Sequence, residues 1–189
     1  MVSFEKDMEP CLAVLREGGL ILYPTDTIWG IGCDATNPAA VEKIYRLKQR
    51  ADEKAMIILV ADERDVLHYV TSPDLQVFDY LQQVTKPTTV IYQGAIGLAD
   101  NLIAPDGSIA IRICKDEFCK HLVKRFRKPI VSTSANISGQ PAAPTYSAIT
   151  EDVRKGVGYI VRYRQDETVP AAPSSLLKWE NGVITLIRP

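Results

Sequence analysis

The chain has 189 residues, of which 46% are hydrophobic and 24% charged, and its formal net charge is −1. This length suits one domain with a full core, and the near-neutral charge excludes a molecule built for sequence-blind attraction to nucleic acid. The amino terminus is acidic, and no stretch approaches the ~18 consecutive apolar residues of a membrane helix. We therefore expect a cytoplasmic protein without membrane attachment, formed by a single domain over residues 1–189.

Hydrophobic periodicity and turn residues predict a series of helices and strands along the chain. A helix over 4–17 and strands over 20–23 and 28–33 come first, followed by a helix that Asn37 caps and that runs toward Lys48. Further strands are expected over 56–60, 88–92, 109–113, 129–131, 159–163, 175–179 and 182–187. Further helices are expected over 62–69, 73–83, 116–126 and 147–155. The alternation is not strictly βαβ, which predicts an α+β fold with a twisted mixed sheet and helices packed on it.

Polar residues gather at three places where predicted elements end. Thr25, Asp26 and Thr27 follow an apolar strand, the run Lys48-Gln49-Arg50 ends a helix, and a turn rich in hydroxyls spans 132–139. Cations together with exposed amides and hydroxyls are what proteins use to hold phosphate and carboxylate oxygens. The three segments predict one concave anion-binding cleft. Taken singly, the cations could simply offset a helix dipole, and the threonines could simply form a turn.

The other familiar chemistries find little support in the residues. The cysteines are Cys11, Cys33, Cys114 and Cys119. Their spacing fits neither a disulfide framework nor paired zinc ligands, so we expect reduced, partly buried thiols and no metal site; a partial metal set with His121 is the weaker alternative. No phosphate-binding Walker loop and no zinc-protease motif occurs. A reaction that proceeds by positioning and charge neutralisation, such as transfer at phosphorus, fits better.

Four motifs in order carry a family resemblance. These are the segment from Tyr23 to Gly32, the Lys48-Gln49-Arg50 run, the strand from Ile109 to Arg112 and the segment from Ser132 to Gly139. Over nearly the whole chain from Leu12, the sequence resembles the YrdC family, the L-threonylcarbamoyladenylate synthases. The resemblance implies that L-threonine, bicarbonate and ATP, with Mg²⁺ carried on the nucleotide, give threonylcarbamoyl-AMP and pyrophosphate. A separate transferase complex would use this product to modify tRNA.

The resemblance also implies roles for single residues. Lys48 and Arg50 would be catalytic. ATP would be bound by Lys48, Arg50, Lys54, Ser108, Asn136 and Arg188. L-threonine would be bound by Thr27, Arg112, Ser134 and Ser174. Lys48 and Arg50 are expected at a solvent-accessible helix end.

Two other classes of function stay open at the level of sequence. The cations that would hold ATP would also attract a phosphate backbone, so the protein could instead be a module that binds double-stranded RNA or tRNA without synthase activity. The surplus of acidic over basic residues argues against this, and tRNA contact is expected to be weak or indirect. A structural or partner-docking protein is the remaining alternative. The sequence leaves open whether the chain is a monomer or a dimer.

Overall fold

The structure is a computed structural model that describes residues 3–49, 56–180 and 182–189. Its helices are α1 (Glu5–Arg16), α2 (Pro38–Lys48), α3 (Glu63–Tyr69), α4 (Gln76–Gln83), α5 (Glu117–Phe126) and α6 (Glu151–Lys155). Its strands are β1 (Ile21–Tyr23), β2 (Gly30–Gly32), β3 (Ile57–Val60), β4 (Thr88–Tyr92), β5 (Ile109–Ile113), β6 (Ile130–Ser134), β7 (Tyr159–Ile160), β8 (Ser175–Glu180) and β9 (Val183–Arg188). Short 3₁₀ turns lie at Asp100–Leu102 and Tyr146–Ala148.

The described strands form one sheet in the order β7-β1-β2-β6-β3-β5-β4-β8-β9. The pairs β7–β1, β3–β5 and β4–β8 are parallel, and the other neighbours are antiparallel. The predicted mixed sheet with packed helices is therefore confirmed. Because β3 and β5 run in the same direction and β4 runs against them, the ends of β3 and β5 and the start of β4 meet at one edge of the sheet.

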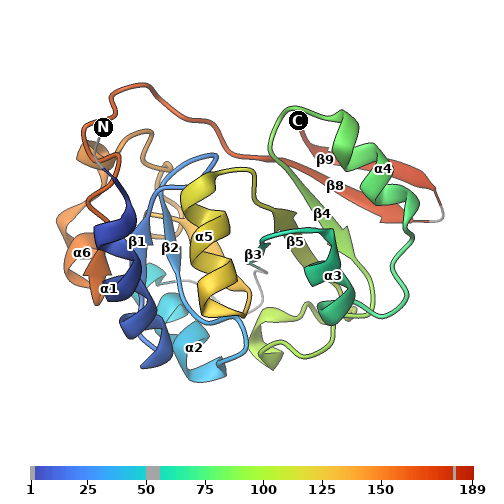
Figure 1. Ribbon diagram of the computed structural model, residues 1–189, viewed down its shortest axis with the longest axis horizontal. Helices are drawn as coiled ribbons and strands as arrows, with labels where there is room; N and C mark the ends of the chain where they lie inside the picture. The colour runs from blue at the N-terminus through green and yellow to red at the C-terminus, as the bar shows by residue number, and fades with distance from the viewer. Residues whose placement is uncertain (1–2, 50–55, 181) are drawn as a thin grey trace.

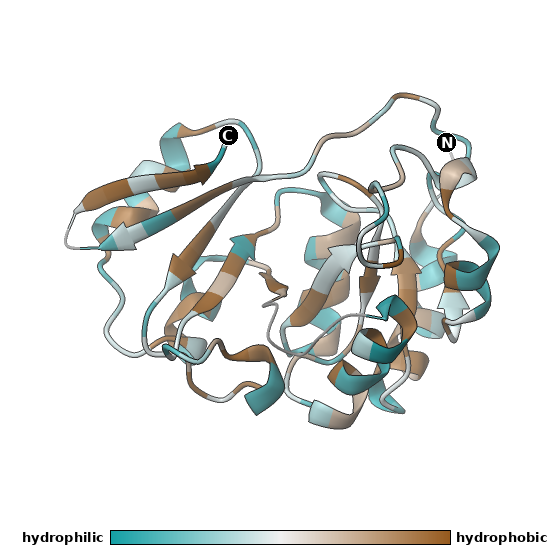
Figure 2. Cartoon of the chain, turned by 180° about the vertical axis from the view of Figure 1, so that it is seen from behind, coloured by the Kyte–Doolittle hydropathy of each residue, from teal (hydrophilic) through white to brown (hydrophobic). Residues whose placement is uncertain are grey.

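Helices cover one face of the sheet more than the other. In Figure 1, α1, α5 and α3 lie in front of the strands, and α1 contacts both α5 and β1 while α5 and α3 contact β3. Figure 2, seen from behind, brings the strands themselves into view. Side chains alternate across β5, so Ile111 is buried under the helices while Ala110 and Arg112 line a pocket on the opposite face. The functional side chains of β5 therefore belong to the less covered face.

β6 differs from the predicted strand at its carboxyl end. The strand was expected to end at Val131, with a tight turn beginning at Ser132, but it continues to Ser134. The hydroxyl residues are held in the strand because β6 is central: Ser132 pairs with Ile57 of β3, and Ser134 pairs with Gly30 of β2. Two neighbours therefore override the turn preference of serine and threonine.

The start of α2 is confirmed as predicted. The side chain of Asn37 accepts hydrogen bonds from the backbone N–H groups of Ala39 and Ala40 at 3.0 and 3.2 Å, and Pro38 occupies the first helical turn. The helix ends at Lys48, because Gln49 adopts a left-handed conformation with φ of 50°. The caps at Asn37 and Gln49 therefore place Lys48 at the last position of α2.

The four cysteines are free and buried, so the expectation of reduced thiols is confirmed. Burial raises the pKa of the Cys11 and Cys114 thiols to about 12, which keeps both protonated and unreactive near neutral pH. The ring of His121 packs against Phe4. The described helices are all too short or too polar to cross a lipid bilayer.

Candidate active site

A pocket of about 360 Å³ lies on the less covered face of the sheet. Its described lining comes from residues 27–30, from β3, β4, β5 and β6, from Ala142, from the segment around the start of β8 and from the end of β9, with no residue of α1–α6. The volume is in the range of sites that hold a small molecule rather than a macromolecular surface.

The pocket brings together about half of the site residues predicted from the sequence. Those that line it are Thr27, Arg112, Ser134, Ser174 and Arg188. Lys48, Ser108 and Asn136 are not part of its described lining. Arg50 and Lys54 lie outside the described residues.

Arg112 supplies a buried positive charge to this pocket. Only 2% of the residue is exposed, and its Nη2 atom lies 3.1 Å from Oδ1 of Asp26. That contact is within ion-pair distance but does not meet hydrogen-bond geometry, so Nε and Nη2 of Arg112 and Oδ1 of Asp26 have no hydrogen-bond partner among the described residues. Asp26 offsets the charge of the guanidinium, but buried N–H groups without a hydrogen-bond acceptor still cost free energy. A carboxylate in the pocket would satisfy the planar fork.

The hydroxyl of Thr27 is held in a defined orientation. Thr25 donates its hydroxyl proton to the carbonyl of Ile28 at 2.8 Å and accepts the backbone N–H of Thr27 at 3.0 Å. Because that proton is committed, the 3.0 Å contact between the two hydroxyls must use the proton of Thr27. Thr27 is part of the pocket lining, so its Oγ1 can act there only as an acceptor, suited to an ammonium or hydroxyl donor.

Ser174 and Arg188 also line the pocket, and a hydrogen bond joins them. The Ser174 hydroxyl lies 2.8 Å from Oγ1 of Thr89, and the Ser174 carbonyl accepts Nε of Arg188 at 3.0 Å. Ser174 is 1% exposed, so a loop residue is fixed as firmly as a strand residue. The remaining N–H groups of Arg188 stay available to an anion.

Lys48 differs from its predicted environment. It was expected at a solvent-accessible helix end, but only 1% of the residue is exposed. Its ammonium donates to the carbonyls of Ser134 and, at 2.7 Å, Asn136, and its own carbonyl accepts the N–H of Ser138 at 2.8 Å. The loop after β6 folds over the end of α2, which buries the lysine. In this conformation Lys48 supports the loop that carries Ser134.

Asn136 and Ser108 are also engaged with their own loops. The Asn136 amide donates to the carbonyls of Ile137 and Gln140 at 3.0 and 2.7 Å, while its Oδ1 is buried without a hydrogen-bond partner among the described residues. The N–H of Ser108 donates to Asp106 at 3.0 Å in the turn before β5. Their predicted contact with ATP stays a prediction.

Sequence reasoning assigned no role to Asp26 or Trp29. Asp26 bridges β5 and the segment that follows it, because Oδ1 faces Arg112 and Oδ2 accepts the N–H of Lys115 at 3.3 Å. Trp29 lines the pocket and packs on the ring of Tyr146, with centroids 4.9 Å apart. Both residues lie within the Tyr23 to Gly32 motif. An aspartate between two threonines at a strand end was the sequence feature that could have indicated a role for Asp26.

Known proteins share the sequence features and the architecture of this chain. The profile of the Sua5/YciO/YrdC family, described as telomere recombination, matches residues 13–189. The chain belongs to this family. A relative from Vibrio campbellii named threonylcarbamoyl-AMP synthase is 34% identical over 157 residues, covering 81% of this chain and 82% of that protein. A relative of the same name from Stenotrophomonas maltophilia is 35% identical over 142 residues, covering 74% and 76%.

Solved structures of the family share the fold. P. abyssi Sua5 complexed with L-threonine superposes with a TM-score of 0.87 at 21% identity, over 100% of this chain and 55% of that chain. E. coli YciO gives a TM-score of 0.82 at 19% identity, over 97% of this chain and 88% of that chain. This chain thus spans little more than half the length of P. abyssi Sua5 and most of the length of YciO.

Proposed function

We propose that this protein is a threonylcarbamoyl-AMP synthase, which converts L-threonine, bicarbonate and ATP to threonylcarbamoyl-AMP and pyrophosphate in the cytoplasm. The observation that carries the proposal is the buried Arg112, whose Nε and Nη2 have no hydrogen-bond partner among the described residues beside a pocket lined with hydroxyls. An amino acid offers a carboxylate for the guanidinium and donors for the hydroxyl oxygens. The names of the curated relatives point to the same reaction.

The geometry supports a division of labour within the pocket. Arg112 binds the threonine carboxylate, and Oγ1 of Thr27 accepts a hydrogen bond from the amine or the side-chain hydroxyl of the substrate. Ser134 contributes a further hydroxyl from the end of β6. Threonine is thereby oriented so that its nitrogen can carry the carboxyl group derived from bicarbonate.

The chemical step needs alignment more than a dedicated base. A carbamate oxygen attacks the α-phosphate of ATP, the new P–O bond forms, and the bond to pyrophosphate breaks. Arg188 and the predicted phosphate ligands Arg50 and Lys54 would offset the charge of the phosphates. The described lining of the pocket contains no carboxylate, which fits Mg²⁺ arriving on the phosphates of the nucleotide substrate.

The RNA-binding alternative is not favoured by this geometry. Lys48 and Arg112 are 1% and 2% exposed, so neither presents its charge on the surface that an extended phosphate backbone would contact. The pocket has the volume of a small-molecule site, whereas RNA recognition uses an extended basic or stacking surface. In this proposal tRNA receives the threonylcarbamoyl group through a separate transferase, and any direct contact of this protein with tRNA is weak.

Replacing Thr27 tests the proposal through binding of L-threonine. Thr27→Val keeps the shape but removes the acceptor, so L-threonine affinity should fall roughly 3- to 30-fold, as expected for one buried hydrogen bond. Thr27→Ser restores the hydroxyl and should stay within a few-fold of the natural protein. Calorimetric titration of all three proteins measures this. Equal affinity in the valine and serine variants would contradict the assigned role of the hydroxyl.

A further inference from the structure

A second pocket, of about 500 Å³, lies on the opposite face of the sheet from the candidate active site. It forms where the carboxyl ends of the parallel strands β3 and β5 meet the start of β4, and α3, α4 and α5 contribute to its walls. The edge at the carboxyl ends of parallel strands is where open sheets with helices most often bind ligands. The pocket therefore has both the position and the size of a ligand site.

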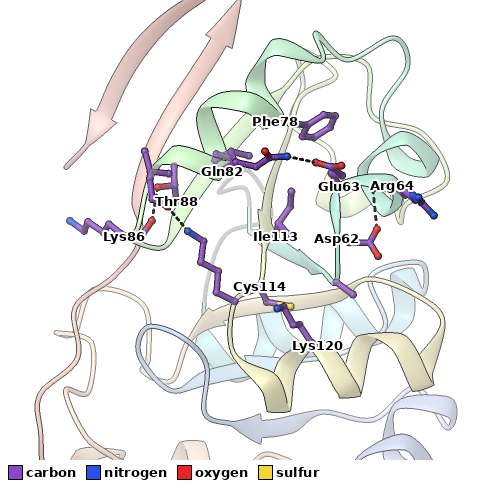
Figure 3. Close-up of a pocket in the computed structure, with 14 residues that line it drawn as sticks. Asp62, Glu63, Arg64, Phe78, Gln82, Lys86, Thr88, Ile113, Cys114 and Lys120 are labelled. Carbon is purple, nitrogen blue, oxygen red and sulfur yellow. Dashed lines mark hydrogen bonds between the residues drawn. The ribbon is translucent and has the colours of Figure 1, made fainter.

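The interior of this second pocket is apolar and its rim is mainly basic. Phe78, Leu81, Val84 and Ile113 form the apolar part. In Figure 3, Ile113 lies between Phe78 and Gln82 on one side and Cys114 and Lys120 on the other. The cationic lining residues are Arg64, Lys86, Lys115 and Lys120.

Four cations against two carboxylates leave the lining with an excess of positive charge, and both carboxylates accept hydrogen bonds from neutral N–H groups. Asp62 accepts the N–H groups of Arg64 and Asp65 at 3.0 and 3.3 Å, and Glu63 accepts the amide of Gln82 at 3.5 Å. Among the described residues the ammonium of Lys120 has one loose ion pair, 3.8 Å from Glu117, and its side chain is 35% exposed. A ligand of this pocket should therefore combine an apolar body with a negative charge.

The pocket is connected to Arg112 by a short series of contacts. The ammonium of Lys115 donates to the carbonyl of Val84, and the N–H of Lys115 donates to Oδ2 of Asp26 at 3.3 Å. The other oxygen of Asp26 lies 3.1 Å from Arg112. Successive residues of β5 thus serve both pockets, with Arg112 on one face and Ile113 on the other.

We propose that this second pocket binds a small organic anion with an apolar body, and that its occupancy alters the affinity of the first pocket for L-threonine through Lys115, Asp26 and Arg112. An anion that contacts Lys115 and packs on Val84 acts on the backbone segment whose N–H positions Asp26. Coupling of this kind is reciprocal, so threonine must change the affinity for the anion by the same factor. The coupling rests on the proposed role of Arg112, whereas the existence of the site does not.

Anilinonaphthalene sulfonate, an aromatic body with one sulfonate, is a suitable probe. Fluorescence titration of the natural protein should give saturable binding of one molecule. Lys120→Glu reverses the nearby charge, and Val84→Trp fills the pocket while keeping the backbone carbonyl that Lys115 uses. Each variant should weaken binding by at least about tenfold. Lys6→Glu, on the exposed face of α1, makes the same charge change away from the pocket and should bind like the natural protein.

The outcomes separate the site from the coupling. Equal affinity in all four proteins, or many weak sites per chain, would overturn the site, and thermal unfolding of each variant confirms that it is folded. Saturating L-threonine should shift the affinity for the probe severalfold in the natural protein, and no shift would overturn the coupling. A protein that binds no L-threonine would count against the proposed function, while the titration of the four proteins would still decide the pocket.

Discussion

Arg112→Lys should weaken the binding of L-threonine by roughly 10- to 100-fold, which corresponds to the loss of a charge-assisted bidentate contact. Lysine keeps a positive charge near Asp26, so the buried carboxylate is not left without a counter-ion. The planar fork with its unused Nε and Nη2 is lost. Calorimetric titration with L-threonine measures the effect.

Asp26→Asn is the matched variant for this prediction. It removes the counter-ion of Arg112 but leaves the guanidinium, so it should change threonine affinity less than Arg112→Lys does. If Arg112→Lys binds L-threonine as tightly as the natural protein, the guanidinium of Arg112 does not contribute to threonine binding. The unused donors of Arg112 would then need another explanation.

Lys48→Met should destabilise the protein by about 3 kcal/mol, because one buried and one half-buried carbonyl lose a charged donor. The ammonium of Lys48 bonds the carbonyls of Ser134 and Asn136, and methionine replaces only the apolar stem. The loop that carries Ser134 should also lose its position, so turnover should fall with stability. Urea unfolding followed by circular dichroism measures the free energy of unfolding.

Arg46→Met provides the control on the same helix. The side chain of Arg46 is 77% exposed, and its ion pair with Glu42 lies between neighbouring turns of α2, a contact worth about 0.5 kcal/mol or less. If Lys48→Met unfolds at the same urea concentration as Arg46→Met, the lysine does not hold the loop. Lys48 would then act only through contact with the substrate.

The regular elements were largely predictable from the sequence because their signals are local. β4 and β5 occupy 88–92 and 109–113 as expected, since each is an apolar run bounded by turn residues. The cap at Asn37 depends only on its own side chain and the next residues. An element is predictable from the sequence where the residues that determine it lie within that element or directly beside it.

The features that escaped prediction depend on distant partners. β6 extends to Ser134 because β2 and β3 pair with it from both sides, and no property of a serine-rich segment reveals that pairing. Lys48 is buried by a loop far along the chain, although its place at a helix end suggested exposure. The ion pair of Asp26 with Arg112 likewise arises only from the order of strands in the sheet.

The most direct test of the proposed function is pyrophosphate release by the purified protein. Reactions with ATP and Mg²⁺ would be run with both L-threonine and bicarbonate, with each alone, and with neither. We expect release only when both are present, and a marked loss of release in Arg112→Lys at low L-threonine. Release that ignores threonine, or none from folded protein under any combination, would contradict the proposal that this pocket makes threonylcarbamoyl-AMP.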